Sequence, residues 1–288
     1  MHLRTTTLSA LILLAALPAG AAGKGPAVHG HRGCRGILPE NTLSAFKEAL
    51  RLGVDVLELD TGVSRDGVVV ISHNRELDPA ICLGPDGKPA KPEPIHSLTL
   101  AELKAYDCGT LKNPRFPGQS PRPGERIPSL AELFALAKDS KVEFNIETKL
   151  VPGEPDVTPS PEEFAGRLVS VVNEYGLQSR VIVQSFDRRT LEAVRKLEPR
   201  IRLAMLTSDN LLDFAAVAKA QKVDIISPDQ LWITKADVDA LHAAGVQVAP
   251  WTVNDEKGWA RMLELGVDAV ITDYPGALIA WLKKRGLR

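Results

Sequence analysis

The sequence predicts an α/β protein, a closed (β/α)8 TIM barrel with a capping insertion after the second strand. Short apolar runs rich in β-branched residues alternate with amphipathic helical patterns along most of the chain. Eight such strand–helix units fit within the 288 residues, and repeated units of this kind form parallel strands with right-handed crossovers. An open doubly wound sheet is the alternative, but no glycine-rich dinucleotide fingerprint opens the first unit.

The predicted barrel strands are the apolar runs at residues 27–31, 54–60, 142–148, 181–186, 201–206, 223–228, 246–253 and 268–273. The predicted helices occupy residues 41–52, 128–139, 161–176, 187–199, 209–221, 234–245, 255–266 and 275–286. Ser129 and Glu132 have the spacing of a capping box, and Asn41 is the predicted N-cap of the first helix. A further apolar run, residues 67–73, also predicts a buried strand.

A long segment rich in proline, glycine and charge, at about residues 76–126, separates the second barrel strand from its helix. It contains one helical stretch, residues 98–106. Segments of this length without regular structure inside a compact domain are commonly lids or binding loops. We therefore predict a cap that helps to select the substrate.

The N-terminus has the features of a secretory signal peptide, predicted for residues 1–23. A short basic start precedes an apolar stretch from Leu8 to Leu17, and small residues that suit a signal peptidase follow at 19–21. The apolar stretch is too short for a stable membrane anchor. We expect the mature barrel domain, residues 24–288, to be periplasmic or secreted; the alternative is a mobile hydrophobic N-terminus.

Export would place the three cysteines in an oxidising compartment. Cys82 and Cys108 lie in the same irregular segment, and we expect them to form a disulfide, the alternative being three free thiols. Cys34 stands beside a histidine motif, but the two-histidine chemistry predicted below needs no thiol nucleophile.

The overall charge gives little reason to expect a macromolecular partner. The chain has 35 basic and 36 acidic residues, and 44% of its residues are hydrophobic, as in ordinary soluble globular proteins. This balance provides no basic footprint for nucleic acid or an anionic membrane. We expect a small-molecule partner, and the sequence makes no prediction of the oligomeric state.

Polar and aromatic side chains stand where the predicted strands end. In a parallel barrel such residues gather at the mouth formed by the C-terminal ends of the strands. The residues expected to face this mouth are His31, Glu58, Asp60, Glu147, Lys149, Gln184, Ser185, Trp251 and Asp273.

Three of these residues form a candidate metal site. Glu58 and Asp60 are two apart, so both carboxylates face the same side of their strand, and Glu147 ends the next barrel strand. Carboxylate oxygens suit Ca2+ or Mg2+ better than Zn2+. The alternatives are a carboxyl group with a raised pKa and ion pairs with Arg32 and Lys149 in place of a metal.

His31 and His73 are the candidate catalytic pair. Imidazole titrates near neutral pH, so one histidine can act as a general base while the other acts as a general acid. The sequence does not assign the two roles. Lys149 and Arg32 would neutralise a phosphate, the alternative for Lys149 being an ion pair with Glu147, and for Arg32 one with Glu58 or Glu147.

Trp251 and Phe186 are predicted to contact the substrate at the mouth, although core packing is the alternative for Phe186. His29 is expected at the barrel floor. His96 and His242 are expected to be structural or solvated.

The first part of the chain resembles the N-terminal signature of the glycerophosphodiester phosphodiesterases. The matching pieces are His31-Arg32-Gly33, Pro39-Glu40-Asn41-Thr42, Ala45-Phe46, Glu58-Leu59-Asp60, Asp66-Gly67 and His73, followed later by PWTVN, LGVD and ITDYP. The chain departs from the family pattern at Cys34-Arg35, where small residues are commoner, and at Asn74, where the family usually has Asp.

This resemblance implies a TIM barrel with an insertion that covers the active-site mouth and a divalent cation, Ca2+ or Mg2+, bound at Glu58, Asp60 and Glu147. It implies hydrolysis of deacylated phospholipids to sn-glycerol 3-phosphate and an alcohol. One alternative keeps the scaffold but acts on lysophospholipid or sphingolipid headgroups, which would need an apolar groove in the cap. The other is a phosphodiester-binding protein without catalysis.

Overall fold

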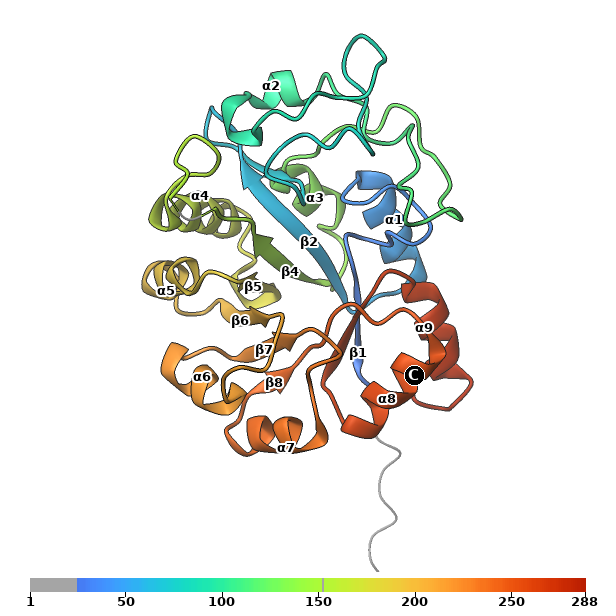
Figure 1. The fold of residues 1–288 in the computed structure, drawn as a ribbon, viewed down its shortest axis with the longest axis vertical. Helices are drawn as coiled ribbons and strands as arrows, with labels where there is room; N and C mark the ends of the chain where they lie inside the picture. The colour runs from blue at the N-terminus through green and yellow to red at the C-terminus, as the bar shows by residue number, and fades with distance from the viewer. Residues whose placement is uncertain (1–24, 152) are drawn as a thin grey trace, which may run out of the picture.

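The computed structural model describes residues 25–151 and 153–288, which form parallel strands rolled into a barrel and surrounded by helices (Figure 1). The predicted signal peptide, residues 1–23, lies outside the described residues. Within them, the eight parallel strands are β1 Ala27–Gly30, β2 Val56–Val63, β4 Glu143–Thr148, β5 Val181–Ser185, β6 Arg202–Thr207, β7 Ile225–Pro228, β8 Gln247–Val248 and β9 Ala269–Thr272.

The strand order is β8-β7-β6-β5-β4-β2-β1-β9, with β1 paired to both β2 and β9. Backbone hydrogen bonds also connect the two ends of this order: Asp268 N donates to Val248 O, and Ile271 N donates to Pro250 O, both at 3.0 Å. The sheet therefore curls back to a nearly closed barrel. The predicted (β/α)8 fold is confirmed, and the open doubly wound alternative is wrong.

The barrel helices lie outside the strands (Figure 1). They are α1 Leu43–Leu52, α3 Leu130–Leu136, α4 Pro161–Glu174, α5 Arg188–Leu197, α6 Phe214–Gln221, α7 Lys235–Ala243, α8 Glu256–Leu265 and α9 Pro275–Lys283. Their apolar faces pack on the sheet in the main core, where Phe46, Phe134 and Phe144 are buried.

A second, smaller apolar layer fills the barrel interior. Its side chains come from six successive positions around the barrel, which places them inside it: Ala27, Ile182, Ala204, Ile225, Ala249 and Ala269. His29 is also buried, and its Nδ1 lies 3.5 Å from the amide nitrogen of Asn145. Burial lowers the pKa of His29 to about 4, so this histidine is neutral and structural.

The N-cap of α1 differs from the predicted one, and the difference affects a residue of the candidate site. Thr42, not Asn41, is the N-cap: its backbone is extended, and its side chain accepts a hydrogen bond from Ala45 N. Asn41 has a left-handed backbone, with φ of 58°, and its amide donates instead to Asp60 at 2.9 Å. The predicted capping box of Ser129 and Glu132 is present at the start of α3.

The apolar run at residues 67–73 forms β3, Val69–Ile71. This strand pairs antiparallel with β2 as a hairpin and is not one of the barrel strands. The cap follows, and Figure 1 shows it beside the C-terminal end of β2. It includes a 3-10 turn at Ile95–Ser97 and the short helix α2, Leu100–Leu103. A second 3-10 turn, Gln178–Arg180, precedes β5.

The cap has a small hydrophobic core of its own, to which both predicted disulfide cysteines belong. Cys82 and Cys108 are bonded, so that prediction is confirmed. Cys34 is free and buried, its thiol donates to Ala45 O, and burial raises its pKa to about 12. A buried, protonated thiol is a poor nucleophile, which agrees with the prediction that catalysis does not use Cys34.

We expect replacement of both Cys82 and Cys108 by alanine to destabilise the cap by about 3 kcal/mol, because the disulfide closes a loop with a sequence separation of 26. Thermal unfolding should show a lower midpoint for the double variant than for Cys34→Ser. Reductant should lower the wild-type midpoint to the level of the double variant. An unchanged wild-type midpoint in reductant would contradict this expectation.

Candidate active site

Three carboxylates meet at the C-terminal ends of β2 and β4. Parallel pairing places Asp60 beside Glu147, and the i, i+2 spacing directs Glu58 to the same side of β2. All three side chains are buried, and each offers a carboxylate oxygen within 4.8 Å of the others. The structure thus brings together the three residues predicted as metal ligands.

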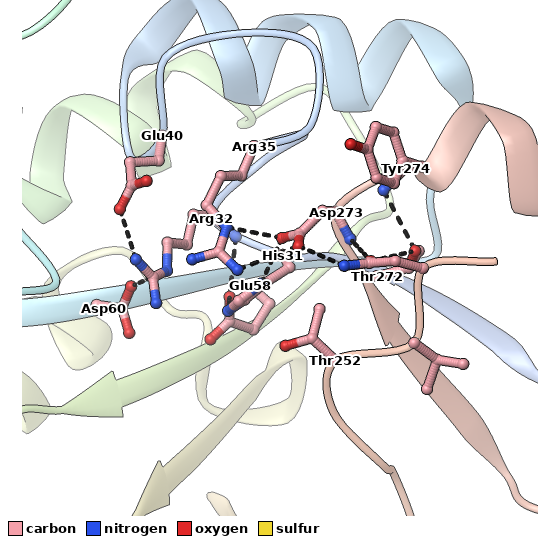
Figure 2. A network of polar contacts seen from close by, with 12 residues as sticks. His31, Arg32, Arg35, Glu40, Glu58, Asp60, Thr252, Thr272, Asp273 and Tyr274 are labelled. Carbon is pink, nitrogen blue, oxygen red and sulfur yellow. Dashed lines mark hydrogen bonds and ion pairs between the residues drawn. The ribbon is translucent and has the colours of Figure 1, made fainter. Parts of the chain in front are cut away.

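Two buried cationic side chains contact this cluster. Arg32 lies between Glu40 and Asp60 (Figure 2), with Nη1 2.5 Å from a Glu40 oxygen and Nε 3.1 Å from an Asp60 oxygen. Lys149 Nζ lies 2.6 Å from Glu147 and 3.1 Å from Asp60. The ion pair between Lys149 and Glu147, the alternative considered from the sequence, is therefore present. The Arg32 side chain pairs with Glu40 and Asp60, whereas the sequence suggested Glu58 or Glu147 as its partner.

The cations do not neutralise the cluster. With Glu40, four carboxylates face the two cationic side chains, so 4 − 2 leaves two negative charges when all six groups are ionised. Burial and the neighbouring Asp60 raise the pKa of Glu58 well above its usual range, and burial raises that of Glu147 to about 7. Burial also opposes ionisation of Asp60, but Lys149 and Arg32 outweigh it and hold its pKa well below the usual range.

His31 is fixed by a carboxylate. Its Nδ1 lies 2.6 Å from Asp273 Oδ1, which also accepts a hydrogen bond from Arg35 Nε at 2.8 Å (Figure 2). Because an ionised carboxylate only accepts, Nδ1 carries the proton. Nε2 therefore faces inward, 3.8 Å from Glu58 Oε2. Burial lowers the pKa of His31, although Asp273 opposes the shift.

His73 is fixed by a chain of two residues. Its Nδ1 lies 2.7 Å from Asn74 Oδ1, and Asn74 Nδ2 donates to Asp78 at 3.0 Å. Asp78 only accepts, so the amide must present its oxygen to His73, whose Nδ1 is again the protonated nitrogen. Asn74 thus fills the hydrogen-bonding role at the position where the sequence departs from the family pattern. Burial lowers the pKa of His73 to about 4, which leaves the ring neutral at pH 7.

A cavity of about 940 Å³ opens beside these groups. His73, Glu147 and Lys149 line its inner part, and the beginning of the cap, residues 75–79, forms part of its wall. Phe186 also lines it, and 51% of this side chain is exposed, so the core-packing alternative for Phe186 is wrong. The Trp251 ring contacts Phe186 edge-on at 5.8 Å between centroids, while its Nε1 donates to Ser227 O.

The comparisons with known proteins agree with this geometry. The profile of the glycerophosphoryl diester phosphodiesterase family matches residues 31–277. The chain belongs to this family. A glycerophosphodiester phosphodiesterase of Caldanaerobacter subterraneus subsp. tengcongensis is 32% identical over 260 residues, which cover 89% of this chain and 97% of the relative.

Solved structures give the same assignment. A crystal structure from Silicibacter pomeroyi is 30% identical with a TM-score of 0.85, covering 91% of this chain and 95% of that chain. An Oleispira antarctica phosphodiesterase in complex with the product sn-glycerol-3-phosphate is 27% identical with a TM-score of 0.77, covering 90% and 97% of the two chains. The protein is accordingly a glycerophosphodiester phosphodiesterase, a phosphoric diester hydrolase.

Several residues that shape this phosphodiesterase site had no predicted role. Gln184 donates to Glu58 Oε1 at 2.8 Å, and Asn254 donates to Asp273 Oδ2 at 2.7 Å. The sequence predicted that Gln184 faces the barrel mouth, because it ends a strand, but it did not predict its hydrogen bond to Glu58. Arg35 is one of the three residues at which the chain departs from the family pattern, and its contact with Asp273 joins positions 238 apart in sequence.

His96 and His242 agree with their predicted structural or solvated roles. His96 lies 2.9 Å from Val63 O, and His242 lies 2.9 Å from Asp268, both away from the carboxylate cluster. In the described part of the chain, no helix of the phosphodiesterase is both long and apolar enough to cross a membrane.

Proposed function

We propose that this phosphodiesterase hydrolyses glycerophosphodiesters, the deacylated phospholipids, to sn-glycerol 3-phosphate and an alcohol by metal-dependent catalysis with two histidines. The observation that carries the proposal is the placement of two imidazoles, each held through Nδ1, beside three converging carboxylates. The product bound in the Oleispira antarctica phosphodiesterase supports sn-glycerol 3-phosphate as the phosphate product.

The carboxylate cluster fits a divalent cation. Its ligand atoms are oxygens, as Ca2+ and Mg2+ prefer. One of them, Asp60 Oδ1, is buried and accepts no hydrogen bond; Lys149 Nζ, 3.1 Å away, forms an ion pair with it. The excess negative charge would be balanced by such an ion. We assign Glu58, Asp60 and Glu147 as its ligands. The bound cation would polarise the phosphoryl oxygens and stabilise the charge that develops on them.

The histidines divide the proton transfers. His73 is neutral with its lone pair on Nε2, so it serves as the general base that takes a proton from the attacking water or glycerol hydroxyl. His31 is assigned as the general acid, because the Asp273 carboxylate 2.6 Å from Nδ1 opposes the lowering of the His31 pKa by burial and orients the ring for proton donation. His31 then donates a proton to the departing alkoxide as the bond between phosphorus and that oxygen breaks.

Lys149 and Arg32 supply fixed positive charge. Lys149 lines the cavity, where its Nζ can contact a phosphate oxygen while it remains on Glu147. Arg32 is held by Glu40 and Asp60, which orients its guanidinium before substrate arrives. Phe186, with Trp251 against it, is assigned to contact with the alcohol portion.

Asn74→Asp is expected to raise the pKa of His73 above its value of about 4, because a carboxylate beside Nδ1 stabilises the imidazolium. A base acts in its neutral form, so the acidic limb of kcat/KM against pH should move to higher pH by about one unit. Asn173→Asp on the exposed face of α4 is the matched control. An acidic limb that stays in place in Asn74→Asp would contradict the base role of His73.

We also propose that the protein acts outside the cytoplasm. The support is the predicted signal peptide together with the Cys82–Cys108 disulfide, since such bonds persist in oxidising compartments. Fractionation of expressing cells should recover the activity with the periplasm or the medium. Recovery from the cytoplasm alone would contradict export.

The product assignment is tested by phosphorus NMR during hydrolysis of glycerophosphocholine with Ca2+ or Mg2+. We expect the diester signal to be replaced by that of sn-glycerol 3-phosphate. An early cyclic phosphate signal would identify the glycerol hydroxyl as the first nucleophile, and its absence would identify water. A diester signal that persists with a folded protein and either metal would contradict the proposed function.

A further inference from the structure

The two imidazoles of this phosphodiesterase site are held by different groups. His31 Nδ1 lies 2.6 Å from the carboxylate of Asp273. His73 Nδ1 lies 2.7 Å from the side-chain amide of Asn74 instead. An ionised carboxylate only accepts hydrogen bonds, but an amide has one accepting and one donating end, so the state of the imidazole depends on which end faces it. The tautomer of His73 therefore depends on the group that orients Asn74.

The carboxylate of Asp78 orients this amide. Its Oδ2 accepts a hydrogen bond from Asn74 Nδ2 at 3.0 Å, which leaves Asn74 Oδ1 to face His73. Its other oxygen, Oδ1, accepts from Ala80 N at 2.8 Å. Both oxygens of Asp78 are thus engaged as acceptors, and the contact with Ala80 N fixes which of them faces Asn74.

The cap holds Asp78 in this position. The backbone carbonyl of Asp78 accepts a hydrogen bond from Cys82 N at 2.9 Å, which closes a turn. Cys82 is bonded to Cys108, and Leu77, the neighbour of Asp78 on the other side, is buried in the hydrophobic core of the cap. The carboxylate that orients the amide therefore stands on an anchored segment in the wall of the active-site cavity.

We propose that Asp78 is a positioning residue for the reaction: through Asn74 it selects the tautomer in which His73 leaves Nε2 unprotonated. This inference rests on the proposed function, in which His73 is the general base. A carboxylate at position 74, which the family usually has, would accept from Nδ1 in either orientation. Because this chain has an amide there, the carboxylate of Asp78 supplies the direction that the amide lacks.

Asp78→Asn is expected to reverse the amide while it preserves the turn. The new amide oxygen stays on Ala80 N, so the new NH2 group takes the place of Oδ2 and faces Asn74. Two NH2 groups offer each other no acceptor, so the Asn74 amide turns over and donates to His73 Nδ1. The ring proton then moves to Nε2, where the base needs its lone pair. We expect kcat for glycerophosphocholine, at the optimum pH of each variant, to fall about tenfold with KM unchanged.

The double variant Asn74→Asp/Asp78→Asn separates orientation of the imidazole from stability of the turn. It exchanges the two side chains, so one oxygen of the carboxylate now next to His73 accepts from Nδ1, and the other accepts from the NH2 group at position 78. The productive tautomer is restored, and we expect kcat to return to within about threefold of the wild-type value. If Asp78 only stabilised the turn, the loss seen in Asp78→Asn would persist in the double variant.

Nitrogen-15 NMR of the imidazole rings at neutral pH reads the tautomer directly, and the His73 signals are identified by their loss in His73→Ala. We expect the proton on Nδ1 in the wild type and in the double variant, and on Nε2 in Asp78→Asn. Asp86→Asn is the matched control, because Asp86 Oδ1 accepts from Lys88 N at 3.1 Å with the same two-residue spacing as Asp78 and Ala80. Its kcat and its His73 signals should equal those of the wild type.

Three outcomes would overturn the positioning role of Asp78. They are a wild-type kcat in Asp78→Asn, an unchanged His73 tautomer in that variant, and a loss of kcat that the double variant retains, which would assign Asp78 to the structure of the cap alone. A wild-type enzyme that does not turn over glycerophosphocholine would refute the proposed function instead. The NMR comparison of the wild type with Asp78→Asn would then still decide whether Asp78 sets the tautomer of His73.

Discussion

Replacement of His31 or His73 by alanine is expected to lower kcat for glycerophosphocholine about 10³-fold each, because general acid and general base catalysis each contribute on this scale. KM should change little, since neither imidazole is assigned to ground-state binding. The two effects should not add fully in the double variant, because both groups act in one concerted proton-transfer arrangement.

His242→Ala is the matched control for this prediction. His242 pairs with Asp268 through a 2.9 Å contact on the outer surface of the barrel, so its loss should leave kcat unchanged. Circular dichroism would confirm that all variants fold. Near wild-type turnover in either active-site variant would exclude the proposed acid–base pair.

Replacement of Glu147 by glutamine is expected to weaken binding of the divalent cation about 100-fold or more and to lower kcat/KM at limiting metal to a similar extent. The change removes one of three anionic oxygens from the cluster while it preserves the size of the side chain. It also removes the ion pair between Lys149 and Glu147, 2.6 Å long, and leaves Lys149 paired with Asp60 alone. Calorimetric titration of the EDTA-treated protein with Ca2+ and Mg2+ would measure the loss directly.

The same strand supplies the control. Glu143 begins β4, pairs with Arg202, and lies at the opposite end of the barrel from Glu147. Glu143→Gln should bind metal as the wild type does. Equal metal affinity in the wild type and in Glu147→Gln would show that this carboxylate is not a ligand.

The sequence predicted the parts of this site that follow from periodicity. Glu58 and Asp60 share a side because strand side chains alternate, and Glu147 joins them because parallel strands end at the same face. The barrel itself followed from the same alternation of buried runs and amphipathic helices. These inferences require only local sequence and the general geometry of the fold.

The contacts that the sequence did not predict depend on loop conformation. Asn41 leaves the N-cap role to Thr42 because its backbone is left-handed, and its amide then reaches Asp60. Arg32 binds Glu40 because the loop after β1 turns back on itself, which brings together residues that are eight apart. The exposure of Leu211 and Leu231 was not predicted for a similar reason: both residues lie on loops without a periodic pattern, so their exposure is visible only in the structure.

Metal dependence is tested most directly by the rate of sn-glycerol 3-phosphate release from glycerophosphocholine after EDTA treatment and after return of Ca2+ or Mg2+. We expect EDTA to abolish release and one of these cations to restore it in the wild type. Neither cation should restore it in Glu147→Gln at the same concentration. Full activity of the wild type in EDTA, with metal content verified as absent, would contradict the assignment of Glu58, Asp60 and Glu147 as a catalytic cation site.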